Sequence, residues 1–211
     1  MMTKALSMKR GQMRLLVGWG VLSLVLSLIA FGTAGCAAKA SSESFLRENV
    51  DIGFVKKIAV LPFQNNSKDE FAPERIRDIV ITQILAMGIF DVVDKGVVDS
   101  VLREEAVEAG KPIDRQALRR IGQRLGVEVV ALGTIDLSGE NRKGSMVYPE
   151  ISITFRMLEV QNGEVIWQGT GHGTGDSVWR RLFGLAAYDV FEVSLEVVKE
   201  LLFSIPITQG G

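Results

Sequence analysis

Two short stretches of this 211-residue sequence hold the residue types from which a reactive site can be built. The first is GTGHGTGDS, residues 169–177, which contains His172, the only histidine of the chain. Its glycines can bring backbone N–H groups close to a phosphate, but the stretch lacks the Gly-Lys-Ser/Thr ending of a P-loop and the strand–turn–helix setting of a dinucleotide site. Glycines where a strand ends and a helix begins more commonly satisfy backbone geometry. We therefore favour a structural interpretation over a ligand site.

The second stretch is FGTAGCAAKASS, residues 31–42, which contains Cys36, the only cysteine. A lone thiol has no partner for an internal disulfide, so this cysteine is free for another modification. An inert small residue inside a membrane helix is the alternative interpretation. The residues before Cys36 favour a modified cysteine over an inert one.

An uncharged segment, residues 15–38, leads into and past Cys36. Before it stand four basic residues and no acidic one: Lys4, Lys9, Arg10 and Arg14. A basic start, an apolar core and a small-residue exit are typical of a bacterial secretory signal peptide, which we predict over residues 1–35. An uncleaved single-pass anchor is the alternative, because about 20 apolar residues can span a bilayer.

The residues Thr33, Ala34, Gly35 and Cys36 resemble a lipobox, where signal peptidase II cuts before a diacylglyceryl-modified cysteine. Ala34 and Gly35 fit the pattern, whereas Thr33 stands where leucine is usual. We predict a covalent lipid on Cys36, including palmitate, and no other cofactor. Two or three acyl chains would hold the protein firmly to a membrane. By resemblance to lipoproteins of Gram-negative bacteria, the absence of Asp after this cysteine implies the outer membrane, with the protein facing the periplasm.

Acidic residues gather at Asp69, Glu70 and Glu74, and again at Glu104 and Glu105. A metal ion there would have only oxygen ligands, because the chain has one histidine and its cysteine is assigned to the lipid. A solvated loop and the first turn of a helix explain the first group, and a wet helix face explains the second. A hydrolase needs a positioned base and nucleophile, which the sequence does not offer. We predict no metal site, no catalytic residues and no enzymatic activity.

Charge argues against a nucleic-acid partner. Removal of residues 1–35 takes four basic residues and no acidic one, which leaves 20 basic against 25 acidic residues. Phosphate binding needs a basic surface, and the remaining chain does not offer one.

The periodicity of apolar residues predicts one folded domain over residues 55–205, between a lipidated N-terminus and flexible tether (36–54) and a C-terminal tail (206–211). Strands are expected at 56–63, 89–94 and 127–136, and a loop at 138–145. Asn162 and Gly163 predict a hairpin turn between strands at 151–160 and 164–173. Helices are expected at 73–87, 97–108, 114–126 and 178–203. This order predicts a single three-layer α/β domain with a mixed β-sheet flanked by helices.

Four segments carry a family resemblance: KIAVLPFQNNS, FDVVDKGVVDSVLREE, LGVEVVALGTI and MLEVQNGEVIWQG. They resemble the bacterial envelope lipoproteins that include the curli secretion channel CsgG and the penicillin-binding-protein activator LpoB, whose domain is similar to the N-terminal domain of TolB. The resemblance covers roughly residues 55–203 and implies this fold. It says little about function, because one fold hosts several roles.

Two roles of the family can be compared with the sequence. A CsgG-like channel subunit inserts two long amphipathic hairpins, whose strands need about 9–11 residues each. Residues 137–150, LSGENRKGSMVYPE, do not show the alternation of apolar and polar residues that such hairpins need. An LpoB-like activator of peptidoglycan synthase uses a long disordered arm, whereas the tether expected here reaches on the order of 60 Å at most. We therefore predict a non-enzymatic outer-membrane lipoprotein that binds protein partners in envelope assembly or secretion, with those two roles as alternatives.

Two sets of residues are candidates for partner binding. Trp179, Arg180 and Arg181 open the last expected helix, and Arg142 and Lys143 lie in the expected loop. Trp and Arg are common where binding energy concentrates at interfaces. The alternative is that Trp179 belongs to the core and the basic residues are solvated. The partners expected are the membrane, through the lipid, and envelope proteins, while self-association is left open.

Overall fold

The computed structural model describes residues 39–48, 50–177, 182 and 184–206. Within these ranges no helix combines the length and the apolar character that a bilayer crossing requires. The predicted signal peptide and Cys36 lie outside the described residues, as does the tail beyond residue 206.

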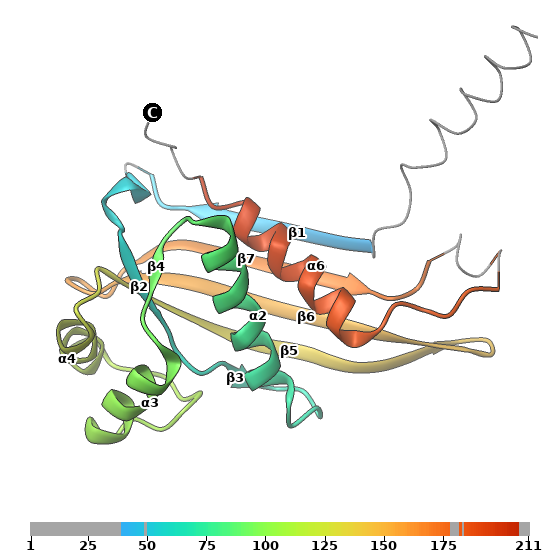
Figure 1. The fold of residues 1–211 in the computed structure, drawn as a ribbon, viewed down its shortest axis with the longest axis horizontal. Helices are drawn as coiled ribbons and strands as arrows, with labels where there is room; N and C mark the ends of the chain where they lie inside the picture. The colour runs from blue at the N-terminus through green and yellow to red at the C-terminus, as the bar shows by residue number, and fades with distance from the viewer. Residues whose placement is uncertain (1–38, 49, 178–181, 183, 207–211) are drawn as a thin grey trace, which may run out of the picture. The chain divides into compact units, whose positions relative to one another are not determined.

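The described residues form a single mixed sheet with helices on both faces (Figure 1). The strands are β1 (Lys39–Leu46), β2 (Lys57–Val60), β3 (Gln64–Asn65), β4 (Asp91–Val92), β5 (Val129–Lys143), β6 (Met146–Glu159) and β7 (Val165–Thr174). The helices are α2 (Ala72–Met87), α3 (Lys95–Glu104), α4 (Arg115–Leu125) and α6 (Val190–Phe203), with a short 3-10 helix η1 (Ile52–Phe54).

The strand order is β1-β7-β6-β5-β2-β4, and β3 also pairs with β5. The pairs among β1, β7, β6 and β5 are antiparallel, whereas β2 is parallel to both β4 and β5. Parallel neighbours need a helical crossover, and α2 supplies the one between β2 and β4. The predicted fold class, a mixed sheet flanked by helices, is confirmed.

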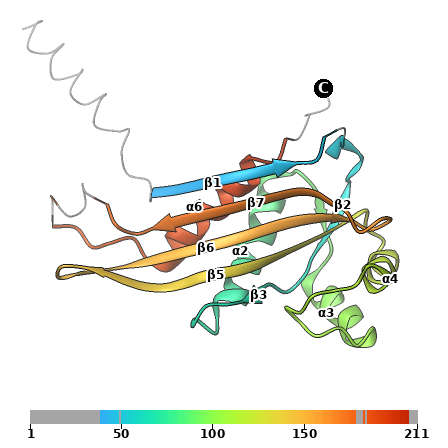
Figure 2. The same cartoon turned by 180° about the vertical axis from the view of Figure 1, so that it is seen from behind.

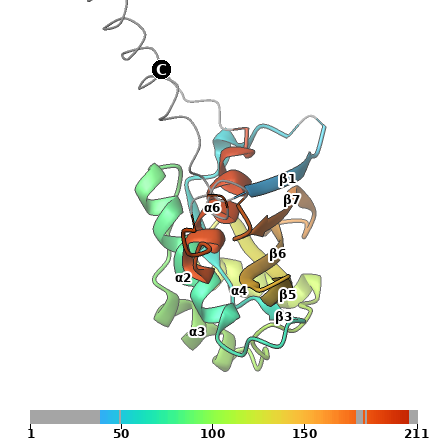
Figure 3. The ribbon, with the colours of Figure 1, turned by 90° about the vertical axis from the view of Figure 1, so that its right-hand side faces the viewer.

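Each face of the sheet has its own hydrophobic core. Helices α2 and α6 lie on one face, where the side chains of Ile76, Ile84, Val197 and Leu201 pack against the inward residues of β2, β5 and β6. Helices α3 and α4 pack on the other face against Ala59, Leu61 and Val130. Figure 3 shows α2 and α6 together beside the sheet. Figure 2 shows that α3 and α4 sit toward one end, so no described helix covers the second face of β1, of β7 and of most of β6.

The sequence signals for α2 and α4 are confirmed. Pro73 stands in the first turn of α2, and Gly88 closes the helix with a φ of 63°. Asp114 caps α4, because its carboxylate accepts hydrogen bonds from the N–H groups of Gln116 and Ala117. Gly126 ends α4 in the left-handed conformation, with a φ of 64°.

The β6–β7 hairpin is confirmed, and its alternation sets the core. Every second residue of β6 from Ile151 to Met157 is buried beneath α2 and α6. The connection is longer than the two-residue turn that Asn-Gly predicts, because it runs from Glu159 to Glu164. Gly163 has a φ of 69°, and Asn162 accepts a hydrogen bond from the Glu164 N–H instead of adopting positive φ.

The prediction of a flexible tether over residues 36–54 is wrong for the part of this segment that the structure describes. Residues 39–46 form β1, which pairs with β7 along its whole length. The serines of this segment give no apolar signal, but backbone N–H and C=O groups need partners, and the edge of β7 supplies them. Ser42 also donates a hydrogen bond to Glu200 of α6 over 3.1 Å.

Two further boundaries differ from expectation. The loop expected at 138–145 continues β5 and β6 as a two-stranded ribbon that turns at Gly144, whose φ is 65°. Beyond the buried Ser138, its polar side chains are solvated while the two backbones satisfy each other. Helix α6 begins at Val190, capped by Asp189, and not near residue 178. Leu182 and Ala186, which lie within the range expected for this helix, are exposed.

Candidate functional site

The glycines of GTGHGTGDS are the place where helix α6 contacts the sheet. Gly169, Gly171 and Gly173 alternate along β7 and face α6. A Cβ at Gly173 would lie 2.4 Å from Val197 Cγ2, and one at Gly171 would lie 2.8 Å from Val197 Cγ1. Glycine is therefore required by the close approach of the helix, and the structural interpretation of this stretch fits the observed packing.

His172 projects from the opposite face of β7. Its Nε2 lies 3.4 Å from a carboxylate oxygen of Glu150 on β6, and the imidazole is about half exposed. Thr154 and Thr170 form the next cross-strand pair on the same face, with their hydroxyl groups 3.2 Å apart. His172 thus belongs to the open polar face of β6 and β7 and not to a phosphate-binding loop.

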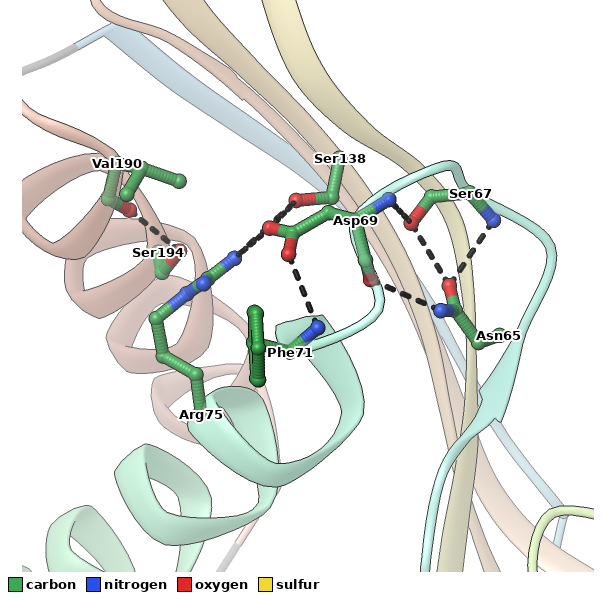
Figure 4. A network of polar contacts seen from close by, with 8 residues as sticks. All are labelled: Asn65, Ser67, Asp69, Phe71, Arg75, Ser138, Val190 and Ser194. Atoms are coloured by element: carbon green, nitrogen blue, oxygen red, sulfur yellow. Dashed lines mark hydrogen bonds and ion pairs between the residues drawn. The ribbon is translucent and has the colours of Figure 1, made fainter.

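A network of hydrogen bonds fixes the loop after β3 (Figure 4). Asp69 is its centre: one carboxylate oxygen lies 2.5 Å from Arg75 Nη2 and accepts a hydrogen bond from Ser138 Oγ over 3.0 Å. The other oxygen accepts the Phe71 N–H, which precedes α2. Asn65 donates to the Asp69 carbonyl oxygen. The network ties β3, the start of α2 and the middle of β5 together.

These contacts change the acidity of Asp69. Burial by itself raises the pKa of the carboxyl group, but the hydrogen bonds from Arg75 and Ser138 outweigh it, so the pKa is lowered. The ionised carboxylate therefore stabilises the fold above the unfolded-state pKa of about 3.9. That contribution is lost as the pH falls through the lower pKa of the folded state.

We expect Asp69→Asn to lower the free energy of unfolding by about 1 kcal/mol at pH 7, because the charge-assisted contacts are partly exposed. The difference from the wild type should shrink below about pH 4, where the native carboxylate loses its advantage. Urea unfolding at pH 7 and pH 3 measures both values. Glu70→Gln, at an exposed position of the same loop, is the control and should change stability little. A difference that stays constant across this pH range would contradict the role of the ionised group.

A groove of about 970 Å³ lies beside this loop. It is lined by the segment after β2, by the first turns of α2, by α3 and by residues 107–112. Arg77 lines its wall with a side chain that is 1% exposed, and its Nε donates to the carbonyl oxygen of Val60 over 3.1 Å. Its Nη1 lies 2.8 Å from Asp99 Oδ1 on α3. Arg77 Nη2 and Asp99 Oδ1 are buried and have no hydrogen-bond partner among the described residues, so the pair is held by charge and not by hydrogen-bond geometry.

Three other residues of the two acidic groups, Glu74, Glu104 and Glu105, are paired with basic side chains. Lys95 lies 2.5 Å from Glu74 and 2.6 Å from Asp78, which joins α3 to α2 at the surface. Glu104 and Glu105 contact Arg124, and Glu105 also contacts Arg120. Within the part of the chain that the structure describes, no group of histidine, cysteine and carboxylate side chains could hold a metal ion.

The predicted partner-binding residues fall into two groups. Arg142 and Lys143 stand at the end of β5, beside the Gly144 turn, and both are exposed. Lys143 lies 3.4 Å from Asp176, while Arg142 makes no side-chain ion pair within the described ranges. Trp179, Arg180 and Arg181 lie outside the described residues, as do Thr33, Ala34, Gly35 and Cys36.

The buried polar residues Arg77, Ser138 and Ser194 were missed by the sequence analysis. Arg77 lies next to Ile76 in α2, and its sequence position hardly distinguishes it from the exposed basic residues of other helices. Ser138 is 3% exposed in a segment that reads as a polar loop. A helical wheel gives a weak signal for Arg77 alone, because it lies one turn before Ile81 on a side between the buried stripe and the solvent.

Comparison with known proteins identifies relatives of this fold. A family model described as peptidoglycan-synthase activator LpoB matches residues 36–172. None of the curated proteins compared with the chain matches it.

Solved structures share the fold at low sequence identity. The PelC dodecamer from Paraburkholderia phytofirmans superposes with a TM-score of 0.56 at 18% identity, over 81% of this chain and 100% of that one. Lipoprotein GNA1162 from Neisseria meningitidis gives a TM-score of 0.51 at 19% identity, over 71% of this chain and 99% of the other. At these identities the structures support the fold alone.

Proposed function

We propose that this chain, which belongs to the peptidoglycan-synthase activator LpoB family, is a non-enzymatic envelope lipoprotein. Its α/β domain binds a protein partner. The observation that carries the proposal is the family match over residues 36–172, which includes six of the seven strands in full and most of β7. A peptidoglycan synthase is the partner that the family favours.

The proposed anchor is a lipid on Cys36 that holds the domain at the periplasmic face of the outer membrane. The lipobox-like residues from Thr33 to Gly35 support this assignment, and so does the apolar segment before them. Because β1 begins at Lys39, the domain has little freedom to leave the membrane. The partner must therefore bring its own binding segment to the domain.

The groove beside Arg77 is the surface proposed for that segment. It combines a concave shape with exposed side chains of both signs, among them Glu70, Arg103 and Lys111. Mixed charge at the rim of a concave surface suits a polar peptide segment and provides specificity through complementary charges. The open face of β6 and β7, with Thr170 and His172, is the second surface to be compared.

We expect the mature protein to raise the rate of glycan polymerisation by a purified peptidoglycan synthase of the same bacterium severalfold. The assay follows polymerisation of fluorescent lipid II with and without the protein, and pull-down measures the complex. Arg103→Glu should weaken both if the groove binds the synthase, while Thr170→Arg, at an exposed position of the open sheet face, should leave both unchanged. Normal binding by Arg103→Glu and loss with Thr170→Arg would move the site to the sheet face. No complex and no rate change with the wild type would refute the synthase as partner.

A further inference from the structure

We propose that the hairpin tip, defined as residues 140–149 of β5 and β6, rests on the membrane surface and binds anionic lipid headgroups. The inference rests on the proposed lipid at Cys36. It adds a second, noncovalent contact between the domain and the bilayer.

The first reason is the length of chain between the lipid and the fold. Lys39 is the first residue of β1, three positions after Cys36. Three fully extended residues span about 11 Å at most. Because β1 is paired with β7 from Lys39 onward, this short link cannot lengthen without breaking strand pairing. The end of the sheet at which β1 starts is therefore held beside the lipid.

The second reason is where the register places the hairpin tip. Lys39, Thr174, Glu150 and Gly139 lie in one cross-strand row. Beyond that row β5 and β6 continue alone to the turn at Gly144 and Ser145, over roughly 15 Å at the usual rise per residue. Figure 2 shows the start of β1 and this tip on the same side of the domain. The tip thus extends about as far past the row as the link to Cys36 can reach.

The third reason is the chemistry of the hairpin tip. Arg142 and Val147 are cross-strand partners, and so are Lys143 and Met146. The Lys143 side chain is 61% exposed and Val147 is 39% exposed. Leu185 is 53% exposed. The residues that follow it, 186–190, line a shallow hollow together with Val147 and Pro149. Basic side chains beside exposed apolar ones suit the interface between anionic headgroups and acyl chains.

Acidic groups near the hairpin tip limit this attraction but do not cancel it. Glu140 is exposed at the base of the tip, and Asp176 lies near Lys143. Glu150 accepts a hydrogen bond from Asn141 and faces His172, on the row behind the tip. The residues closest to the turn, Arg142 and Lys143, are both basic, so the outermost part of the tip is positive.

The test uses the lipidated full-length mature protein in vesicles, with one introduced cysteine as a labelling site. Ser145→Cys places a fluorescent maleimide at the hairpin tip, and Gln161→Cys places it in the β6–β7 loop at the other end of the sheet. Both positions are exposed. Since Cys36 is the only native cysteine, the unsubstituted protein should take up no label if that thiol carries lipid. Labelling of the unsubstituted protein would refute the lipid anchor and, with it, the membrane contact of the hairpin tip that rests on that anchor.

In vesicles containing phosphatidylglycerol, headgroup-quencher lipids should quench the label at position 145 severalfold more strongly than at position 161. Arg142→Glu combined with Lys143→Glu should reduce quenching at position 145 by at least about fivefold. Equal quenching at the two positions would overturn the contact. Equal quenching at position 145 in phosphatidylcholine and phosphatidylglycerol vesicles would overturn the choice of anionic headgroups as the ligand.

Discussion

Replacing Gly173 with alanine is expected to lower the free energy of unfolding by about 2–3 kcal/mol, because the added methyl group overpacks the contact between β7 and α6. The new Cβ would lie 2.4 Å from Val197 Cγ2 and 3.0 Å from Val193 Cγ1. Both neighbours are buried residues of the α6 stripe, so neither can turn toward solvent. The helix must shift away from the sheet, and the shift weakens its other contacts.

Gly139→Ala is the matched control for this substitution. Gly139 is also a strand glycine, yet a Cβ there meets nothing within 4 Å. Its stability should stay within about 0.5 kcal/mol of the wild type. Thermal and urea unfolding of both variants give the comparison. Equal losses in the two variants would show that the glycines of β7 are not required by helix packing.

The second large effect is expected at the Arg77–Asp99 pair. Asp99→Ala leaves a guanidinium that is 1% exposed without its counter-charge. Loss of one partner of a buried pair typically costs 3–5 kcal/mol, and because Asp99 is itself partly exposed we expect about 2–3 kcal/mol here. The double variant Arg77→Met with Asp99→Ala should recover much of this loss, because it removes the buried charge as well.

Lys95→Ala provides the control for the Arg77–Asp99 pair, since Lys95 also joins α3 to α2 through ion pairs. These pairs are exposed, so their loss should cost less than about 1 kcal/mol. Urea unfolding of Asp99→Ala, of Arg77→Met and of the double variant completes a double-mutant cycle, and Lys95→Ala is measured beside it as the control. A double variant as unstable as the sum of its single changes would contradict the counter-charge role of Asp99.

The parts of the fold with one buried face could be predicted from the sequence. The alternation from Ile151 to Met157 and the stripe from Ile76 to Ile84 both report burial, and both elements form as expected. Asp114 and Gly126 mark the ends of α4 because capping is a local interaction. Such signals act within a few residues, so one sequence is enough to find them.

The parts that depend on distant partners could not be predicted. Half of strand β1 is serine or alanine, and only the edge of β7 and the closeness of α6 make it a strand. The glycines of β7 carry no apolar pattern, because their function is to leave room for Val197 and Leu201. Arg77 and Ser138 are buried by residues far away in the sequence. In each case a tertiary contact outweighs local preference.

Strand β1 also determines when the domain can complete its folding during synthesis. Its partner residues in β7 run from Trp167 to Thr174, so the first strand to leave the ribosome waits for the last one. Until then its serines have no sheet to join. Contacts between such distant segments form slowly, because a long loop must close first. A nascent chain therefore stays incompletely folded until nearly all of it has been translated, the state in which a polypeptide can still be threaded through a narrow translocation channel.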